Sequence, residues 1–424
     1  MTPRIMLLAA AAAALAGAAA ADTIRIATFN ASMNRNAAGE LRADLESGTN
    51  QQLRTIAEII QRVDPDVLLI NEFDYEAAGD LPALFNSNYL NIGQNVSGAG
   101  PAAPVDYAYS FTAPSNTGVA SGFDLDNNGS VGGPNDAKGF GFFEGQFGMA
   151  VFSKYEIDAA NARTFQNFLW KDMPGARLPV DPADGAAWYS DEDLAVLPLS
   201  SKSHWDLPVI VGGETVHLLA SHPTPPVFDG PEDRNGLRNA DEIRFWADYV
   251  NGEDYFYDDL GGLGGLGADA KFVIVGDLNS DPVDGDSLPG AAQQLLDDPL
   301  VNTSLTPGSE GGVDAASRQG GANLSHVGDP FFDTADFADS APGNLRADYV
   351  LPSATLDLIA AGVFWPKPND PLFALAGDFP FPSSDHRLVW VDVAVSPAPI
   401  PLPAAAWLLL GGLGALGLAG RRRA

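Results

Sequence analysis

The chain of 424 residues is long enough for one large domain or two ordinary ones, and its 46% hydrophobic content excludes an intrinsically disordered protein. Cysteine is absent, which excludes a thiol nucleophile, a cysteine-ligated zinc and any disulfide. The 55 acidic and 23 basic residues give a formal net charge of −32, which leaves no broad basic surface for nucleic acid and suits small substrates, cations or a saline habitat.

The N-terminus has the pattern of an export signal. Arg4 precedes an apolar, alanine-rich run that ends in small residues at Ala21, just before Asp22. A basic start, an apolar stretch and a small-residue end are typical of a secretory signal peptide, predicted here over residues 1–21. The alternative for this segment is a buried N-terminal helix.

Hydrophobic periodicity then predicts an α/β body. Alternating apolar residues indicate a strand at 24–30, helical spacing indicates a helix at 50–62 that ends before Pro65, and the run 67–70 indicates a buried strand leading into Asn71 and Glu72. Residues 93–146 show little periodicity. Further strands are expected at 148–153, 209–211, 216–221, 272–275, 348–351 and 388–395, with a helix at 239–251 and Gly-rich surface loops at 261–267 and 308–321. No repeat or linker interrupts residues 22–395, which are predicted to form one domain.

The C-terminal residues have the pattern of a membrane-sorting tail. A Pro-rich linker at 396–403 precedes an uncharged stretch at 404–420, near the short limit for a spanning helix of about 20 residues, and a basic tail at 421–424 is expected to stay cytoplasmic. The Pro-Leu-Pro-Ala string, the short apolar stretch and the arginines resemble the bacterial PEP-CTERM class of sorting tails. The resemblance implies membrane anchoring, removal by a sorting protease and delivery to the cell surface or the extracellular matrix. Loss of both ends would remove four arginines and no acids, giving a charge of −36.

Three acid-bearing strings in the last third of the chain carry candidate chemistry. They are Val-Gly-Asp-Leu-Asn-Ser-Asp at 275–281, Arg-Ala-Asp-Tyr-Val at 346–350 and Ser-Asp-His-Arg at 384–387. The first and last adjoin β-branched runs, so their polar ends are expected at strand termini, where a rigid sheet can hold side chains together. They supply carboxylates for a hard metal ion, an amide, and a histidine with an aspartate to orient it. This set is suited to the hydrolysis of a phosphate ester.

The order of the polar motifs resembles the endonuclease/exonuclease/phosphatase superfamily, which includes DNase I-like nucleases, inositol polyphosphate phosphatases and bacterial sphingomyelinases. The match spans roughly residues 24–393 and rests on Ala27-Thr28-Phe29-Asn30, Asn71-Glu72, residues 148–155, Ser221-His222-Pro223, residues 276–279, residues 346–349 and Ser384-Asp385-His386. The resemblance implies a DNase I-like α/β (α+β) fold, a four-layer sandwich of two packed mixed β-sheets flanked by helices. It makes residues 22–395 the catalytic domain, expected to be monomeric.

Carboxylates and amides at strand ends are the candidate metal and phosphate ligands. Glu72 is a candidate ligand for Mg²⁺ (or Mn²⁺), which prefers one or two carboxylates plus water and substrate oxygens. The resemblance makes Asp277 the water-activating base or a second metal ligand, and Asp385 a further metal ligand or a water contact. Asn30 is expected to form a hydrogen bond with the metal-bound water or with the phosphate. The resemblance makes Asn279 a phosphate contact.

Two histidines are the candidate acid–base groups. His386 has a family-matched partner in Asp348, and a carboxylate on one ring nitrogen leaves the other for the reacting phosphate or water. His222 is expected either to donate a proton to the leaving oxygen or to bind phosphate. Pro223 and Ala347 depart from the usual family pattern.

Several cations are further candidates. Arg234 and Arg238 are expected to hold phosphate in bidentate fashion or to form salt bridges with nearby acids. Lys202 and His204 would share one face of an extended segment, in a substrate groove or on an edge strand.

An acidic loop has the spacing of a calcium site. Asp124, Asp126, Asn128 and Ser130 match the front of a calcium-binding loop, with Gly129 at its sixth position. Its twelfth position is an asparagine rather than a bidentate glutamate. Ca²⁺ binding and a turn-rich polar loop are both open.

These observations predict an exported, divalent-metal-dependent phosphoesterase that hydrolyses a phosphodiester by water attack, as nucleases do. A phosphomonoesterase or phospholipid phosphodiesterase of the same superfamily is the alternative. The second alternative, from another class, is a non-catalytic calcium-binding surface or matrix protein. No P-loop, Gly-x-Ser-x-Gly elbow or His-Glu-x-x-His motif is present.

Overall fold

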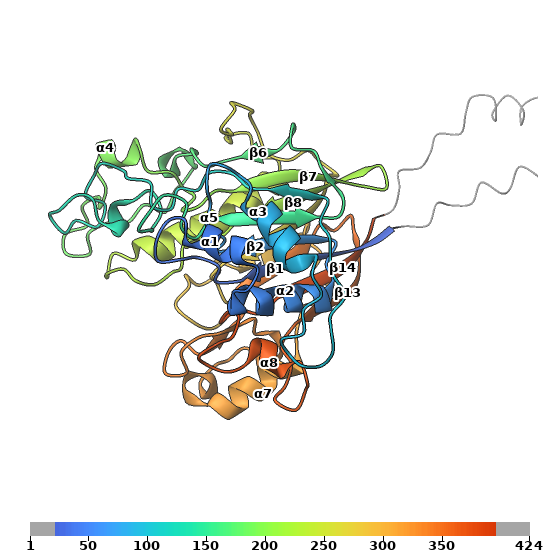
Figure 1. Ribbon diagram of the computed structural model, residues 1–424. Helices are drawn as coiled ribbons and strands as arrows, with labels where there is room; N and C mark the ends of the chain where they lie inside the picture. The colour runs from blue at the N-terminus through green and yellow to red at the C-terminus, as the bar shows by residue number, and fades with distance from the viewer. Residues whose placement is uncertain (1–21, 396–424) are drawn as a thin grey trace, which may run out of the picture. The chain divides into compact units, whose positions relative to one another are not determined.

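Two mixed β-sheets form the centre of the domain (Figure 1). The computed structural model describes residues 22–395, of which Thr23–Val395 form one compact unit. The first sheet has the order β13 (Asp357–Val363), β14 (Val389–Val395), β1 (Asp22–Asn30), β2 (Val67–Asn71), β4 (Met149–Ser153), β3 (Tyr109–Phe111). The second has the order β12 (Asp348–Pro352), β9 (Lys271–Asp277), β8 (Glu214–Ala220), β7 (Trp205–Val211), β5 (Glu156–Ile157), with β6 (Arg163–Thr164) also paired to β7. The pairs β1–β2 and β8–β9 are parallel, whereas β2–β4 and β9–β12 are antiparallel.

Three apolar layers hold the sheets and helices together. Strand β2 shows the pattern, because side chains alternate between the two faces of a strand. Val67 and Leu69 pack between the two sheets, whereas Leu68 and Ile70 pack on the outer side with α1 (Glu40–Ser47) and α2 (Gln51–Val63). On the far side of the second sheet, α5 (Arg234–Val250) packs against β8 and β9. The predicted four-layer sandwich is confirmed.

Most predicted elements are present within a few residues of their expected ends. The Asn50 side chain caps α2 by accepting a hydrogen bond from the Leu53 amide at 3.2 Å, and Asp64 ends the helix in a left-handed conformation before Pro65. Helix α5 begins five residues before the predicted 239, where the polar and glycine-containing sequence hides the helical pattern.

The Gly-rich stretch at 308–321 was predicted to be a surface loop, and this prediction is wrong. It contains α7 (Glu310–Gln319), whose first turn is capped by the Ser309 hydroxyl. Gly311 is buried, and a Cβ there would overlap the carbonyl oxygen of Trp365. The glycine therefore permits close helix packing, a tertiary contact that composition does not reveal.

The remaining elements are short. They are α3 (Leu81–Phe85), α4 (Asp191–Leu194), α6 (Gln293–Leu296), α8 (Phe373–Ala376) and the paired strands β10 (Ala335–Asp336) and β11 (Asn344–Leu345), together with single turns of 3₁₀ or π helix. Within residues 22–395, no helix is both long and apolar enough to cross a bilayer. The predicted signal peptide, Pro-rich linker, spanning segment and basic tail lie outside the described residues.

Candidate active site

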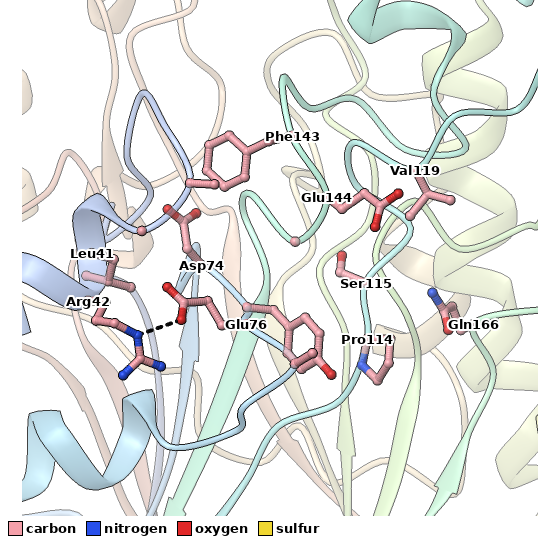
Figure 2. A pocket seen from close by; sticks show the side chains of 15 residues that line it. Leu41, Arg42, Asp74, Glu76, Pro114, Ser115, Val119, Phe143, Glu144 and Gln166 are labelled. Carbon is pink, nitrogen blue, oxygen red and sulfur yellow. Dashed lines mark hydrogen bonds and ion pairs between the residues drawn. The ribbon is translucent and has the colours of Figure 1, made fainter.

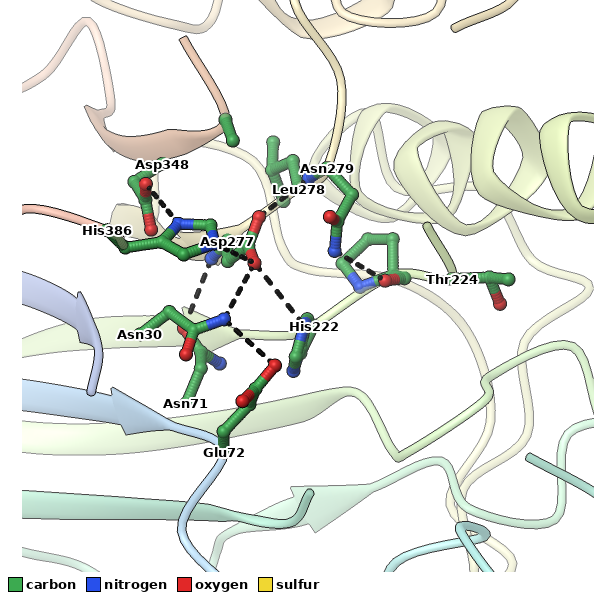
Figure 3. A network of polar contacts seen from close by, with 12 residues as sticks. Asn30, Asn71, Glu72, His222, Thr224, Asp277, Leu278, Asn279, Asp348 and His386 are labelled. Carbon is green, nitrogen blue, oxygen red and sulfur yellow. Dashed lines mark hydrogen bonds and ion pairs between the residues drawn. The ribbon is translucent and has the colours of Figure 1, made fainter. Parts of the chain in front are cut away.

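Strand ends from both sheets bring the predicted polar residues to one edge. Asn30 ends β1 beside Asn71 at the end of β2, and Asp277 ends β9 opposite Asp348, which begins β12. Asn71 joins the sheets here, because its Oδ1 accepts from the Asp277 amide at 3.1 Å and its Nδ2 donates to the Ser221 carbonyl at 3.3 Å. The pairing of the strands thus gathers residues far apart in the chain (Figure 3).

Three nitrogens converge on one oxygen of the buried Asp277 side chain. Asn30 Nδ2 lies 3.0 Å from Asp277 Oδ2, His222 Nε2 lies 3.4 Å from it and His386 Nε2 lies 3.7 Å from it (Figure 3). Burial opposes ionisation of this carboxyl, but the His386 and His222 imidazoles outweigh burial and hold the pKa of Asp277 below its usual range. Asp277 is therefore a carboxylate at neutral pH.

His386 is oriented by Asp348, as predicted for this pair. The distance from His386 Nδ1 to Asp348 Oδ2 is 2.9 Å, which leaves Nε2 facing Asp277. Burial alone would lower the pKa of His386, but the Asp348 and Asp277 carboxylates outweigh it and raise that pKa well above its ordinary value. His386 is therefore a protonated donor in this arrangement.

Thr334 holds Asp348 in place, a role that no sequence pattern indicates. Its hydroxyl donates to Asp348 Oδ2 at 2.9 Å and accepts from the amides of Ala347 and Asp348, each at 2.9 Å. Thr334 lies in an irregular segment just before β10, so no local periodicity marks it. The role of Asn71 in joining the sheets was also missed, although its place beside Glu72 at a strand end was a usable signal.

The acids around Glu72 fit a divalent cation. Glu72 Oε1 accepts from Asn30 Nδ2 at 3.2 Å. Burial, with a smaller contribution from the charges of Asp385 and Asp277, outweighs the opposing effects of His386 and the Asn30 hydrogen bond and raises the pKa of Glu72 to about 7. Burial makes neighbouring carboxyl groups costly to ionise. The charge of a bound Mg²⁺ or Mn²⁺ ion would offset the repulsion between the carboxylates, so these acids suit either cation. Ligand atoms of Asp277, Asp348 and His386 also lie within 4.8 Å of one another. In this second group, Asp348 Oδ2 already accepts a hydrogen bond from Thr334 and lies 2.9 Å from His386 Nδ1, so this oxygen is used within the protein.

Asn279 and Lys202 also come to this edge. The Asn279 amide donates to Asp277 Oδ1 at 2.9 Å, and its Nδ2 donates to the Pro223 carbonyl at 3.2 Å, next to His222. Lys202 is buried, and burial lowers its pKa while the carboxylates of Glu242, Glu72 and Asp277 oppose that shift. Lys202 is therefore a buried amine on which the carboxylates of the site act directly.

His204 does not reach the site, contrary to the substrate contact predicted for it. Its Nδ1 lies 3.0 Å from Ser200 Oγ, its Nε2 lies 2.9 Å from the Glu242 carbonyl oxygen, and its ring packs on Phe245. Both ring nitrogens are used inside the protein. The chain bends at residues 201–202 instead of extending, which separates His204 from Lys202.

The predicted arginine clamp is also not formed. Arg238 donates to the carbonyls of Leu199, Lys138 and Pro198 at 2.7–2.9 Å, which ties loops together. Arg234 forms an ion pair with Glu232, the salt-bridge alternative for this residue.

The acidic loop gathers three carboxylates in a different combination from the one predicted. Ligand atoms of Asp124 and Asp126 lie within 4.8 Å of Asp136, which follows the expected twelfth position. Asp124 accepts from the amides of Asn128 and Gly129, and Asn128 Oδ1 accepts from the Ser130 amide. Ca²⁺ binding by this loop stays a prediction.

A cavity of about 560 Å³ lies beside the loop that follows β2 (Figure 2). Residues 74–77, 114–115, 119 and 143–145 contribute to its lining, and Asp74 is two residues beyond Glu72. Three acids line it, Asp74, Glu76 and Glu144, and the cation Arg42 is paired with Glu76 at 2.8 Å. Burial raises the pKa of Asp74 to about 7. The cavity has the size of a small-molecule site and an acidic lining.

The buried carboxyl group of Asp333, next to Thr334, should make the stability of the folded protein depend on pH. Asp333 is 7% exposed, and burial with the charges of Asp281, Asp284 and Asp329 raises its pKa to about 8, against about 3.9 in an unfolded chain. The folded state therefore binds the Asp333 proton more tightly, and stability is lost as pH rises through about 8. We expect Asp333→Asn to raise Tm more at pH 9 than at pH 5. The exposed Asp357→Asn is the control, and equal gains at both pH values would contradict the expectation.

Comparison with known proteins identifies the family. The family model described as "Endonuclease/Exonuclease/phosphatase family" matches residues 27–386. No curated protein matches the chain. The chain is similar to an endonuclease/exonuclease/phosphatase structure from Beutenbergia cavernae, with 17% identity, a TM-score of 0.47, and coverage of 89% of this chain and 73% of that one. It is also similar to sphingomyelinase C from Streptomyces griseocarneus, with 15% identity, a TM-score of 0.43, and coverage of 88% of this chain and 99% of that one. A Staphylococcus aureus beta toxin with bound magnesium ions is similar at 14% identity and a TM-score of 0.40, with coverage of 88% of this chain and 99% of that one. Because the family model covers most of its length, the chain belongs to the endonuclease/exonuclease/phosphatase family.

Proposed function

We propose that this protein hydrolyses a phosphodiester by direct attack of water. Family membership supplies the coarser assignment, a metal-dependent phosphoester hydrolase. The observation that carries the proposal is the convergence of Asn30, His222 and His386 nitrogens on one oxygen of Asp277. Such a cluster can hold the attacking water against the Asp277 carboxylate, which accepts a hydrogen bond, while hydrogen-bond donors of the cluster face the phosphoryl oxygens of the substrate.

Each residue has a role that its surroundings support. Asp277, held ionised, accepts the proton of the attacking water, and protonated His386 donates a hydrogen bond to a phosphoryl oxygen. Burial lowers the pKa of His222 to about 4, with Lys202 adding to this effect, so the ring is neutral at neutral pH. Its Nδ1 is buried without a partner among the described residues, and because Nε2 faces the Asp277 carboxylate, Nδ1 of the neutral ring can accept a hydrogen bond from a water or a substrate hydroxyl but cannot donate to a phosphoryl oxygen.

Glu72, Asp385 and Asp277 are the residues that would hold Mg²⁺ or Mn²⁺. When bound, the ion would neutralise charge on the phosphoryl and leaving oxygens. Asn30 would orient this group, because its Nδ2 contacts both Glu72 and Asp277.

The electrostatics favour a small or lipid phosphodiester over nucleic acid. Lys154 and Arg234, two cations that a nuclease surface would use, are paired with carboxylates instead. The cavity that Asp74 lines has room for the non-reacting ester group of a small substrate. Export with C-terminal membrane sorting is part of the proposal and rests on the sequence patterns at the two ends. Fractionation of cells that produce the full chain tests this part.

A substrate panel at two salt concentrations tests the assignment. The purified protein with Mg²⁺ is offered a small aryl phosphodiester, sphingomyelin vesicles, duplex DNA, RNA and a phosphomonoester. We expect turnover of a small or lipid diester that changes little between 50 and 200 mM salt, whereas DNA binding through 6–10 phosphate contacts would weaken about 10³–10⁵-fold. Preferred, steeply salt-dependent DNA cleavage would show a nuclease. No turnover on any substrate, together with calorimetric Ca²⁺ binding, would favour the non-catalytic surface protein.

A further inference from the structure

One face of α5 presents a row of buried polar side chains to the loops that carry the site. Asn239, Glu242 and Trp246 are three and four residues apart, a spacing that puts them on one side of a helix. All three are 0% exposed. A buried carboxylate in such a row is costly unless its oxygens are fully hydrogen-bonded.

Glu242 bonds to two loops at once. Its Oε1 accepts from the Ser201 amide at 2.7 Å, and its Oε2 accepts from the Thr224 amide at 2.6 Å. Ser201 directly precedes Lys202, and Thr224 lies two residues after His222. One carboxylate therefore fixes the backbone on which two site residues stand, through charge-assisted hydrogen bonds.

The neighbours of Glu242 extend the same framework. Asn239 Nδ2 donates to the carbonyls of Thr224 and Leu278, each at 2.8 Å, and so links the His222 loop to the segment that follows Asp277. Trp246 Nε1 donates to Ser221 Oγ at 2.9 Å. The His204 ring, at 2.9 Å from the Glu242 carbonyl oxygen, anchors the Lys202 loop to the helix.

We propose that Glu242 is a positioning residue for the reaction, which holds Lys202 and His222 against Asp277. The proposal rests on the proposed function for its catalytic meaning. Glu242 does not itself contact the site side chains Asn30, Asp277 or His386 through any hydrogen bond found in residues 22–395. Its effect is geometric, through the two loop amides, and its charge also opposes the lowering of the pKa of the buried Lys202 amine.

The adjacent residue on the same helix provides a matched control. Asp241 is also 0% exposed, and its Oδ2 accepts from Trp170 Nε1 at 2.8 Å and from the Arg177 amide at 2.6 Å. It therefore does for the 170–177 segment what Glu242 does for the two site loops. An Asp241 variant therefore measures how much Tm and kcat fall when a buried carboxylate that binds a loop away from the site is lost.

The experiment compares Glu242→Gln with Asp241→Asn. In Glu242→Gln one oxygen becomes an NH₂ group that faces a backbone N–H, so one of the two loops must move. We expect both variants to lose Tm, but only Glu242→Gln to lose kcat, by about 100-fold, the effect of a displacement of roughly 1 Å, with KM little changed. Equal kcat in the two variants would overturn the proposal.

A second measurement does not depend on activity. The chain has five histidines, so the His222 ring signals can be assigned in a ¹³C–¹H spectrum by comparison with His222→Asn. At one fixed pH, Glu242→Gln should shift these signals and Asp241→Asn should not. If the wild type hydrolyses no phosphoester, the proposed function fails while this spectrum still decides whether Glu242 positions His222.

The shorter Glu242→Asp variant covers the case in which Glu242→Gln does not fold. Its carboxylate keeps the charge but lacks the length to reach both amides. A shifted His222 signal and reduced kcat in a folded Glu242→Asp variant would support positioning. Wild-type signals and kcat would overturn it.

Discussion

His386→Ala is expected to lower kcat by roughly 10²–10⁴-fold, the range for loss of a positioned acid–base group. The His386 ring is held by Asp348 at 2.9 Å and directs Nε2 toward Asp277 at 3.7 Å, so alanine removes a donor that the structure holds in one orientation. Because Asp348 and Asp277 keep the imidazole protonated, its removal takes away a cation as well as a hydrogen bond. The measurement is steady-state kinetics on the substrate that the panel identifies.

A second histidine–aspartate pair makes the control specific. His217 Nδ1 lies 2.6 Å from Asp206 Oδ1 on strands β8 and β7, and His217 is bonded to none of the site residues described above. His217→Ala should therefore leave kcat within about twofold of wild type, as for substitutions away from a site. Equal losses in the two variants would indicate a general effect of removing a histidine, and unchanged activity in His386→Ala would remove this residue from the mechanism.

Chelation of divalent ions is expected to abolish activity, and Mg²⁺ or Mn²⁺ should restore it. Glu72 and Asp277 both accept from Asn30 Nδ2, and burial is the largest cause of the rise in the pKa of Glu72 to about 7, so the unneutralised site resists full ionisation. In Glu72→Gln the charge that draws the cation is lost while the shape of the side chain is kept. We expect the Mg²⁺ concentration for half-maximal activity to rise by more than the roughly 10–100-fold effect typical of residues that only support a ligand.

Glu76→Gln is the matched control for this experiment. Glu76 lies four residues further on, lines the cavity and is paired with Arg42 rather than with the metal-ligand candidates. Its loss should leave the Mg²⁺ requirement unchanged, as isothermal titration calorimetry with Mg²⁺ can show directly. Activity that persists in EDTA, or equal Mg²⁺ binding by Glu72→Gln and wild type, would contradict the metal assignment.

Two predictions failed where tertiary contacts overrode the local sequence pattern. The Gly-rich 308–321 stretch contains helix α7, and its Gly311 permits a close approach to Trp365, which lies 54 residues further along the chain. Lys202 and His204 have the spacing of one strand face, but a bend sends one toward Glu72 and Asp277 and the other into the α5 core. Short-range patterns cannot distinguish a bend from an extended segment when both are polar.

The sequence by itself determined the sheet-forming segments and the polar residues at their ends. Strand β1 with Asn30, β2 with Glu72 and β9 with Asp277 were all predictable, because burial of a strand imposes a pattern on consecutive residues. Only the tertiary structure decided which partners these side chains meet. Thr334 on Asp348, Asn71 between the sheets and Glu242 beneath Lys202 and His222 act through contacts between distant segments. Such contacts depend on how the four layers pack, and packing leaves no periodic trace in the sequence near the residues that it joins.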